Sequence, residues 1–407
     1  MQDENLKQTM NESALTQVKV IDLTQFIAGP YCTKLMSGFG AEVIKVERPD
    51  TGDGMRSRGP FYANEQGLER SIPFLYLNTG KKSITLNLKT SAGLAIFKRL
   101  LKDADVLIEN FPPKVRLNLG LAYEIIKQWN PKIIMTSISN FGQTGPYKDY
   151  KAEEIVEYAM SGLMFLTGDA DRAPLAAGPA ITQYAAGQTA YAATLMALYK
   201  RELTGQGQFI DVSIQECALD LRQLTIMDYL ATGAIPKRNS DRHPLCPWQA
   251  YPCRDGYAVI VGAPVRHWPR IAAVVGNPEL ADRKYRRMKD RIRRRYRIEA
   301  ILKPWLDMHA RQDIYHAGHS KGLAFGYVAS LKEVLVSPQL QARQYFTQVE
   351  HPVVGKHMYC GAPFRPSQTP WQSRRAPLLG EHNESVYCGD LGYSKDEFIS
   401  MAERGII

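Results

Sequence analysis

The stretch VKVIDLTQFIAGPYCTKLMSGFGAEVIKVE, residues 18–47, contains two short apolar runs on either side of a turn and a helix-forming segment. The runs Val18–Leu23 and Glu42–Glu47 are rich in valine and isoleucine, which favour strands. Between them, Ala28-Gly29-Pro30 indicates a turn and Tyr31–Gly38 a helix. A strand, a helix and a second strand within about 30 residues predict a βαβ unit with parallel strands.

The same alternation continues downstream. Further strands are predicted at Ser83–Leu88, Ala104–Glu109 and Lys132–Ile138, and helices at Leu94–Leu101 and Leu121–Trp129. This order predicts an α/β fold in which a parallel sheet carries helices on both faces. Ligands of such sheets bind beyond the carboxyl ends of the strands. The polar residues that follow the strands are therefore site candidates: Gln25, Arg48, Asn78, Lys81, Asn110 and Ser139.

The length of 407 residues is large for one hydrophobic core, so we expect two domains. From about residue 222 the composition changes, with Trp248, Trp268 and Trp305 and a strand pattern at Gly256–Val261. We predict a disordered tail over residues 1–15. A large domain is expected over 16–221, a smaller domain over 222–340, and a return to the large domain over 341–407.

The net charge of +10 is concentrated in a basic run, Arg283–Arg297, in which Asp290 is the one opposing charge. No nucleic-acid motif surrounds this helix-forming run. We interpret it as a solvated helix face or a contact with an acidic partner, and expect no nucleic-acid binding. A basic face would also speed the approach of polyanionic ligands.

Several classes of protein are disfavoured by what the sequence lacks. It has no run of about 18 apolar residues and no apolar signal core, so we expect a cytoplasmic protein without a membrane segment. The six cysteines are dispersed without a CxxC pair, which favours reduced thiols. GxGxxG, GxxxxGK[ST], HExxH and GxSxG are absent, so no nicotinamide, flavin or metal cofactor is expected. Phosphates would be held by scattered cations, for which Arg48, Lys81, Lys82 and Lys114 are candidates; the alternative for each is an ordinary surface charge.

The segment Glu153–Gln188 predicts a helix, a glycine turn, a proline-containing loop and a second helix of small residues. Small side chains allow close backbone approach, so we expect the second helix to be buried. Free N–H groups and the helix dipole at its start favour chemistry on an anion or a thioester. Gln183 lies at this position.

The chain resembles the class III CoA-transferases, which include formyl-CoA transferase and carnitine CoA-transferase. α-Methylacyl-CoA racemases share the same blocks, so the resemblance determines the fold better than the reaction. The resemblance covers about residues 18–407 and depends on ordered blocks: VIDLTQFIAGPYCT (20–33), AEVIKVERPDTGD (41–53), NTGKKSITLNLKT (78–90), ADVLIENF (104–111), GLAYE (120–124), NPKIIMTSISNFGQTGPY (130–147), SGLMFLTG (161–168), TGQGQFIDVSIQE (204–216) and APLLGEH (376–382).

This resemblance implies a Rossmann-like large domain built from both chain ends, a smaller α+β domain, and two subunits interlocked like linked rings. It implies coenzyme A or an acyl-CoA as substrate, lying over the large domain near the subunit interface. A second arginine that the family often has after the ENF block is replaced here by Asn118, with Arg116 two residues earlier. The implied CoA-binding residues are Gln25, Ile27, Ala28, Arg48, Leu77, Asn78, Lys81, Asn110, Phe111 and Arg116.

In the transferases, an aspartate in the pattern GxxxxDxxxG attacks the thioester and forms a mixed anhydride. An ionised carboxylate can do this because it is an anion at neutral pH and a competent leaving group afterwards. Here the pattern runs from Gly178 to Gly187 with Gln183 in place of the aspartate, and a neutral amide cannot serve as that nucleophile. Asp169 and Asp171 are interpreted as turn residues and not as substitutes.

In the racemases, a His-Asp pair acts as acid and base on the α-carbon. The matching positions here are Glu153 and Glu154. Adjacent residues of a helix point in different directions, so we favour a helix-face charge or an interface contact over a catalytic role for these carboxylates.

The leading hypothesis is a non-catalytic subunit of a heteromeric CoA-transferase, whose paralogous partner carries the aspartate. This arrangement is closest in type to a subunit of the heteromeric benzylsuccinate CoA-transferases, with succinyl-CoA as donor and an aryl-succinate as acceptor. One alternative is a self-sufficient homodimeric isomerase, racemase or lyase that uses Glu153 or Glu154. A third hypothesis is a CoA-binding regulator without turnover.

Overall fold

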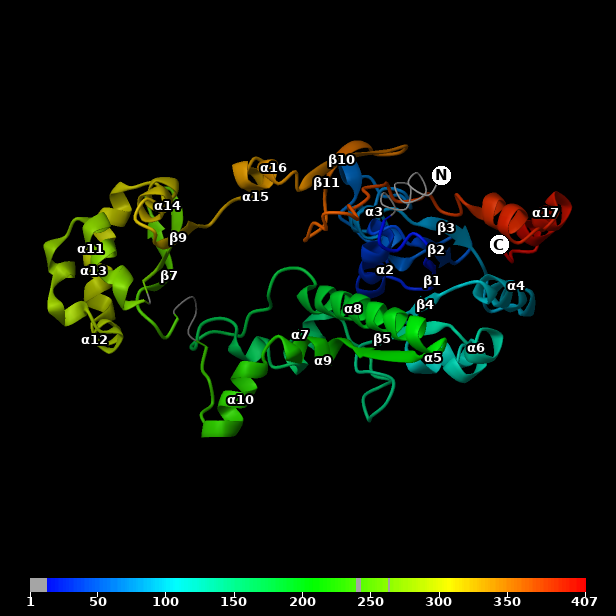
Figure 1. Ribbon diagram of the computed structural model, residues 1–407, viewed down its shortest axis with the longest axis horizontal. Helices are drawn as coiled ribbons and strands as arrows, with labels where there is room; N and C mark the ends of the chain where they lie inside the picture. Colours follow the sequence, from blue (N-terminus) through cyan, green and yellow to red (C-terminus); the bar gives the residue numbers. More distant parts are fainter. Residues whose placement is uncertain (1–12, 239–242, 263) are drawn as a thin grey trace. The chain divides into compact units, whose positions relative to one another are not determined.

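The computed structural model describes residues 13–238, 243–262 and 264–407, which form two compact units (Figure 1). The first unit contains the described residues up to Met164, together with Ala176–Ala234 and Ala342–Ile407. The second contains Phe165–Leu175 and Ile235–Gln341.

The division differs from the predicted boundary at residue 222 in two ways. Helix α10 (Gln223–Thr232) groups with the first unit. The short segment 165–175 groups with the second unit, because the guanidinium of Arg238 binds the carbonyl groups of Phe165, Asp169, Ala170 and Arg172. These hydrogen bonds join a loop to a chain segment about 65 to 75 residues away, which sequence patterns do not reveal.

A parallel six-stranded sheet forms the centre of the first unit and confirms the predicted α/β class. The predicted strand at 42–47 has the same bounds in the structure, whereas the one at 83–88 is shorter and begins one residue earlier. The order of the strands is β3-β2-β1-β4-β5-β6, with bounds β1 Lys19–Asp22, β2 Glu42–Glu47, β3 Lys82–Thr85, β4 Val106–Glu109, β5 Ile134–Ser139 and β6 Phe209–Ser213.

Helices cover both faces of this sheet, because successive strand side chains point to opposite faces. On one face, α2 (Ala28–Gly38) and α8 (Ile181–Thr204) pack against residues such as Val20, Val43 and Ile134. On the other face, α4 (Ser91–Lys102) and α6 (Tyr123–Trp129) pack with the C-terminal segment. The remaining helices and strands of this unit are α3 Ile72–Leu77, α5 Pro113–Asn118, α7 Glu154–Met160, α9 Ile214–Asp220, β10 Phe346–His351, β11 Gly355–Cys360 and α17 Lys395–Glu403.

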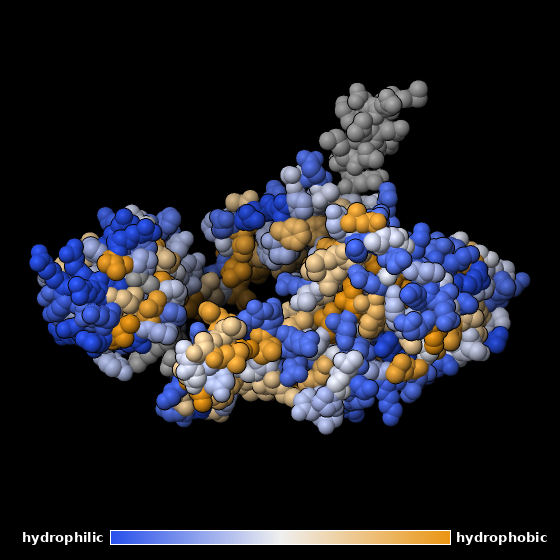
Figure 2. Space-filling view, turned by 60° about the horizontal axis from the view of Figure 1, so that its bottom comes forward, coloured by the Kyte–Doolittle hydropathy of each residue, from blue (hydrophilic) through white to orange (hydrophobic). Residues whose placement is uncertain are grey.

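Helix α8, which was expected to be buried, is buried on one side only. Its small residues allow close contact with α2, and a Cβ atom at Gly187 would lie 2.6 Å from the Ala28 carbonyl oxygen. On its other side, Met196, Tyr199 and Leu203 are 66%, 70% and 66% exposed. Helix α10 also exposes apolar side chains, and Figure 2 shows apolar groups at the surface in this region.

The second unit packs helices against a three-stranded antiparallel sheet, β7-β8-β9. Trp268, Tyr285 and Trp305 are buried in its core. No helix among the residues that the structure describes is long and apolar enough to cross a bilayer. The bounds are β7 Trp248–Cys253, β8 Gly256–Val261, β9 Ala324–Tyr327, α11 Trp268–Val275, α12 Met288–Arg293, α13 Arg295–Met308, α14 Arg311–His319, α15 Leu331–Leu335 and α16 Pro338–Ala342.

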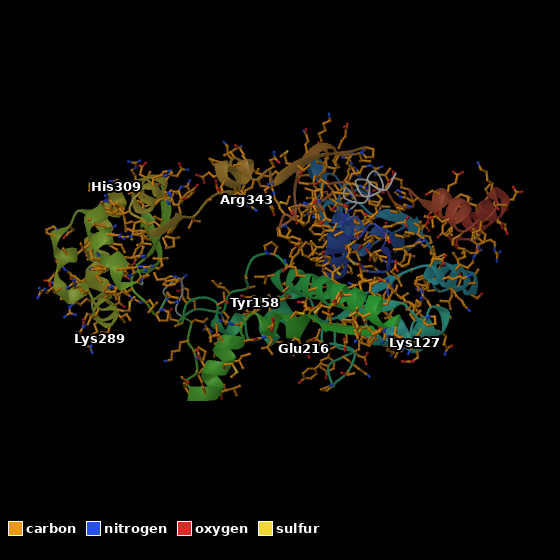
Figure 3. The ribbon with its side chains drawn as sticks, in the orientation of Figure 1. Lys127, Tyr158, Glu216, Lys289, His309 and Arg343 are labelled. Atoms are coloured by element: carbon orange, nitrogen blue, oxygen red, sulfur yellow. The ribbon has the colours of Figure 1, made fainter. Side chains whose placement is uncertain are left out.

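The basic run 283–297 is only partly a solvated face. Lys289 lies on α12 and is exposed (Figure 3), but Arg291 is fully buried. The Arg291 guanidinium binds the carbonyl groups of Cys246, Tyr285, Arg286 and Gly262. Arg297 forms an ion pair with Glu279. Part of the positive charge therefore stabilises the second unit itself.

Candidate functional site

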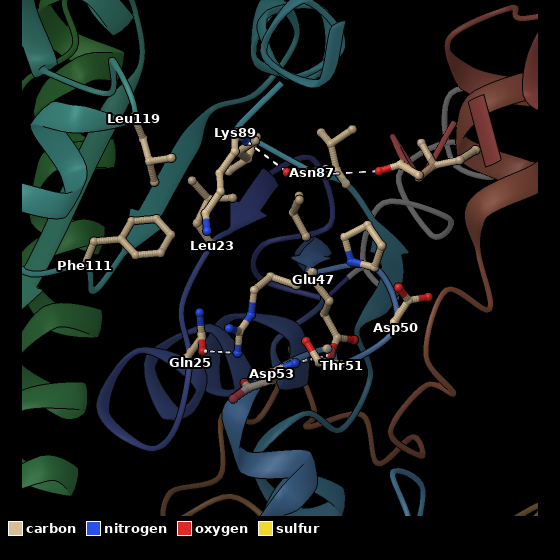
Figure 4. Close-up of a pocket in the computed structure, with 18 of the residues that line it drawn as sticks. Leu23, Gln25, Glu47, Asp50, Thr51, Asp53, Asn87, Lys89, Phe111 and Leu119 are labelled. Carbon is tan, nitrogen blue, oxygen red and sulfur yellow. Dashed lines mark hydrogen bonds between the residues drawn. The ribbon is translucent and has the colours of Figure 1, made fainter. Parts of the chain in front are cut away.

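A pocket of about 640 Å³ opens at the carboxyl ends of β1, β2, β3 and β4 in the first unit (Figure 4). Its walls come from the ends of these strands and the residues that follow them, from α5, and from the end of α17 and the C-terminal segment after it. The lining residues are Leu23, Thr24, Gln25, Val46, Glu47, Arg48, Pro49, Asp50, Thr51, Gly52, Asp53, Leu86, Asn87, Leu88, Lys89, Phe111, Val115, Leu119, Ala402, Glu403, Gly405 and Ile407.

The pocket combines apolar walls with two cations and with the carboxylates of Glu47, Asp50, Asp53 and Glu403. Leu23, Phe111 and Leu119 form apolar surface, and Arg48 and Lys89 supply positive charge. The backbone N–H of Asn87 donates to the Ile406 carbonyl at 2.7 Å, which fixes the C-terminal wall. Apolar walls with a few placed polar and charged groups suit a nucleotide whose phosphates meet the cations.

Only Gln25, Arg48 and Phe111 among the expected CoA-binding residues line this pocket. Lys81 does not. Its ammonium is buried and donates to Asp22 Oδ2 at 3.0 Å, to the Pro30 carbonyl at 3.0 Å and to Asn78 Oδ1 at 2.8 Å. An ammonium has three donors, so none is left for a phosphate.

Lys81 belongs to a buried charge network beneath the sheet ends. The Lys45 ammonium lies 2.8 Å from an Asp53 carboxylate oxygen and 4.0 Å from one of Asp22. Although burial opposes it, Lys45 and Lys81 hold the pKa of Asp22 well below its usual range. Lys81 and Asn78 therefore hold the strand ends in place through contacts within the protein.

The other expected CoA-binding residues also have partners within the protein or are buried. Arg116 is buried and donates to Gln143 Oε1 at 2.9 Å, with Glu109 3.6 Å away. The Asn110 side chain joins two strand ends by exchanging hydrogen bonds of 2.8 and 2.7 Å with the Gln25 backbone. Ala28 and Leu77 are fully buried, and Ile27 packs against the cluster around Phe74.

Gln183 lies in the first turn of α8, and two glutamates of α7 surround this helix end. Ala180, the residue before the helix, has a left-handed conformation and no side chain that could cap it. Glu154 acts as the cap: its Oε1 accepts from the Thr182 N–H at 3.0 Å, and its Oε2 accepts from the Gln183 N–H at 3.2 Å and from the Thr182 hydroxyl. Carboxylates are stabilised at this end of a helix.

Glu157 is the site residue that sequence reasoning missed. Its Oε2 accepts from Gln183 Nε2 at 2.7 Å and from the Thr182 hydroxyl at 3.3 Å. With the Asn140 amide oriented so that both of its polar atoms are paired, its nitrogen donates to Glu157 Oε1 at 3.0 Å. The i,i+3 spacing from Glu154 is the sequence signal that places both carboxylates on one helix face.

Burial raises the pKa of Glu157 to about 7, the nearby Glu154 carboxylate adds to this effect, and the hydrogen bonds from Gln183 and Thr182 oppose it. A proton is therefore exchangeable at Glu157 near neutral pH. Glu153, by contrast, is exposed, and its carboxylate lies 3.7 Å from Arg58. Adjacent in the sequence, Glu153 and Glu154 have different environments, as expected from their positions.

A family model described as CoA-transferase family III matches residues 15–383. The chain belongs to this family. Members of this family use CoA thioesters as substrates.

Curated relatives of this family III chain cover nearly its whole length. It is 34% identical to succinyl-CoA–D-citramalate CoA-transferase of Chloroflexus aurantiacus, covering 97% of this chain and 98% of the relative. It is also 34% identical to succinyl-CoA:glutarate CoA-transferase of Mus musculus, covering 97% and 90%. A solved structure of a CAIB/BAIF family protein from Brucella suis is 32% identical, with a TM-score of 0.84 and coverage of 93% and 99%.

Proposed function

We propose that this chain is a subunit of a class III CoA-transferase that lacks the attacking carboxylate and works with a paralogous subunit that has it. The observation that carries this proposal is Gln183 at the start of α8. Its amide nitrogen donates to Glu157, and Glu154 beside it accepts from the N–H groups at the start of α8. An amide cannot form the acyl anhydride that a carboxylate forms.

Succinyl-CoA is the proposed donor and a carboxylic acid such as an aryl-succinate the acceptor. Two relatives that align over nearly the whole chain carry succinyl-CoA in their names, with citramalate or glutarate as the second acid. These acids share a second carboxylate. We therefore extend the same substrate class to this chain.

The nucleotide end of CoA is proposed to bind in the 640 Å³ pocket, with its phosphates at Arg48 and Lys89 and the adenine against Phe111 and Leu119. The bound cofactor would then extend from the sheet edge toward the start of α8, where α2 and α8 meet. A non-catalytic subunit of this kind would bind the thioester without attacking it.

The proposed partner is an aspartate-bearing paralogue, and the two chains form the interlocked dimer of the family. The exposed apolar side chains of α8 and α10 support an association of this kind, because such groups gain stability when a partner covers them. Co-purification of the tagged chain, with mass spectrometry of the bound partner, identifies the second subunit.

The decisive assay compares CoA transfer by the isolated chain, the isolated partner and the complex. We expect no transfer by the isolated chain and robust transfer by the complex. Turnover by the isolated chain would instead support the homodimeric isomerase, racemase or lyase. That alternative has less geometric support, because Glu154 caps α8 and Glu153 is solvent-exposed. Binding of CoA without transfer by any combination would support the regulator.

A further inference from the structure

A group of aromatic and basic side chains lies beside the start of α8, in the first unit. We call it the tyrosine–lysine cluster; its members are Tyr31, Lys34, Tyr76, Tyr184, Tyr345 and Cys360. Tyr184 follows Gln183 directly, and its ring packs edge-on against Tyr31 at 4.8 Å. The cluster therefore begins one residue from the position at which relatives have their nucleophile.

Lys34 is the unusual member, because it is a buried cation without a counter-charge. The described residues include three buried lysines, of which Lys45 and Lys81 form ion pairs with buried aspartates. Lys34 is 3% exposed, yet within the described part of the chain it has neither an ion pair nor a hydrogen bond. Its ammonium instead lies 3.1 Å from the centroid of the Tyr76 ring.

An unpaired ammonium that is almost buried is costly, because it loses most of its hydration without gaining an anion. A cation–π contact recovers only part of that free energy. Burial accordingly lowers the pKa of Lys34 to about 7; Lys81 acts in the same direction and Cys360 opposes it. A bound anion would supply the counter-charge that the protein itself does not.

The members of the tyrosine–lysine cluster around Lys34 are phenols and one thiol, which can donate hydrogen bonds, and none of these described residues is a carboxylic acid. Burial raises the pKa values of Tyr31, Tyr76 and Tyr184, so their hydroxyl groups stay protonated at neutral pH. A cavity of about 310 Å³ reaches the cluster at Tyr76 and Cys360. One ammonium with several phenolic donors next to a cavity matches the chemistry of a carboxylate ligand.

We propose that Lys34, with the hydroxyl groups of Tyr76 and Tyr184, binds the free carboxylate of a dicarboxylic acyl group whose thioester end lies at Gln183. This inference rests on the proposed function, since it assumes that an acyl-CoA occupies the first unit. It adds the residues that select a dicarboxylic over a monocarboxylic acyl chain, and it holds whether or not this chain turns the thioester over.

The test is calorimetric binding to the full-length protein, in complex with its partner where that is how it purifies. CoA, succinyl-CoA and butyryl-CoA are titrated separately, since the last two have acyl chains of equal length and differ in the terminal carboxylate. Succinate titrated in the presence of CoA distinguishes a free acid from an acyl group as the ligand. We expect succinyl-CoA to bind about tenfold or more tightly than butyryl-CoA.

Lys34→Met should remove this preference and leave the affinity for CoA unchanged. Lys89→Met is the matched control at the nucleotide end, and it should weaken all three ligands equally. If Lys34→Met does not fold, Lys34→Gln and Tyr76→Phe make the same comparison. Tight binding of succinate with no preference among the thioesters would overturn the assignment to an acyl group.

Two outcomes would overturn the inference and leave the proposed function intact. In the first, the Lys34 variants still prefer succinyl-CoA. In the second, the wild-type protein binds CoA but shows no preference between the two thioesters. Failure of the wild-type protein to bind CoA at all would overturn both. The two failures are therefore distinguishable in one set of titrations.

Discussion

The side-chain nitrogen of Gln183 donates to a carboxylate oxygen of Glu157 across 2.7 Å. The structure thus has a buried carboxyl group one side chain away from Gln183, the position at which the proposed function places the missing nucleophile. A carboxyl group, that of Glu157, is therefore present beside Gln183, but it is buried. This contact determines which substitutions could place a working nucleophile at position 183.

Gln183→Asp alone should restore little CoA transfer to the isolated chain. The new aspartate would lie beside the Glu154 and Glu157 carboxylates and would lose the donor that now binds Glu157. Neighbouring carboxylates resist joint ionisation, so the new group would hold a proton near neutral pH. The double variant Gln183→Asp/Glu157→Ala should transfer CoA measurably faster than the single variant in a chromatographic assay with succinyl-CoA. Equal rates for the two would show that Glu157 does not limit the site.

Glu157→Gln should stabilise the protein at alkaline pH. Because the pKa of Glu157 is raised to about 7, its contribution to stability falls as pH rises from about 4.5 through 7. The variant removes the buried charge, so its melting temperature should exceed that of the wild type at pH 8 by several degrees and match it near pH 4. Glu153→Gln is the control: this exposed carboxylate should change stability by less than about 0.5 kcal/mol at any pH. A flat pH profile for Glu157→Gln would contradict the burial argument.

Lys34→Met should also stabilise the protein, with the opposite pH dependence. The folded-state pKa of Lys34 is lowered to about 7, so the wild-type protein gains stability from Lys34 as pH rises from about 7 toward 10.5. The advantage of the variant should be greatest below pH 7 and should vanish near pH 10. Urea unfolding at pH 6, 8 and 10 measures it, and an advantage independent of pH would mean that packing alone is responsible.

Variants of Lys81 and Lys89 should distinguish a charge that stabilises the fold from a charge that binds the ligand. Lys81→Met leaves Asp22 buried with one cation fewer and should cost about 3 kcal/mol or more of stability. Lys89→Met should leave the melting temperature unchanged, weaken CoA binding and reduce its dependence on salt. Thermal unfolding and CoA titrations at two salt concentrations distinguish these roles. Loss of stability in Lys89→Met, with CoA affinity retained, would reverse the assignment.

The local pattern was sufficient for much of the fold. The strands at 42–47 and 256–261 have the predicted bounds, because β-branched runs limited by turn residues have few alternatives. The pattern was misleading for α8, whose small residues predicted full burial. Those small residues lie on the side that meets α2, and the large apolar residues on the other side remain exposed. A composition averaged over a helix does not distinguish its faces.

The sequence by itself determined the first strands and helices of the large domain, the family, and the presence of Gln183 between Gly178 and Gly187, because each of these depends on residue type and spacing along the chain. Only the tertiary structure decided which of the charged or polar side chains have a partner within the protein and which do not. Lys81 is neutralised by Asp22, which is 59 residues away, Gln183 is bound by Glu157, and Lys34 is left without an anion. Pairing and burial arise from atoms that folding brings together, and a lysine that is paired cannot be told from one that is not until its neighbours are in place.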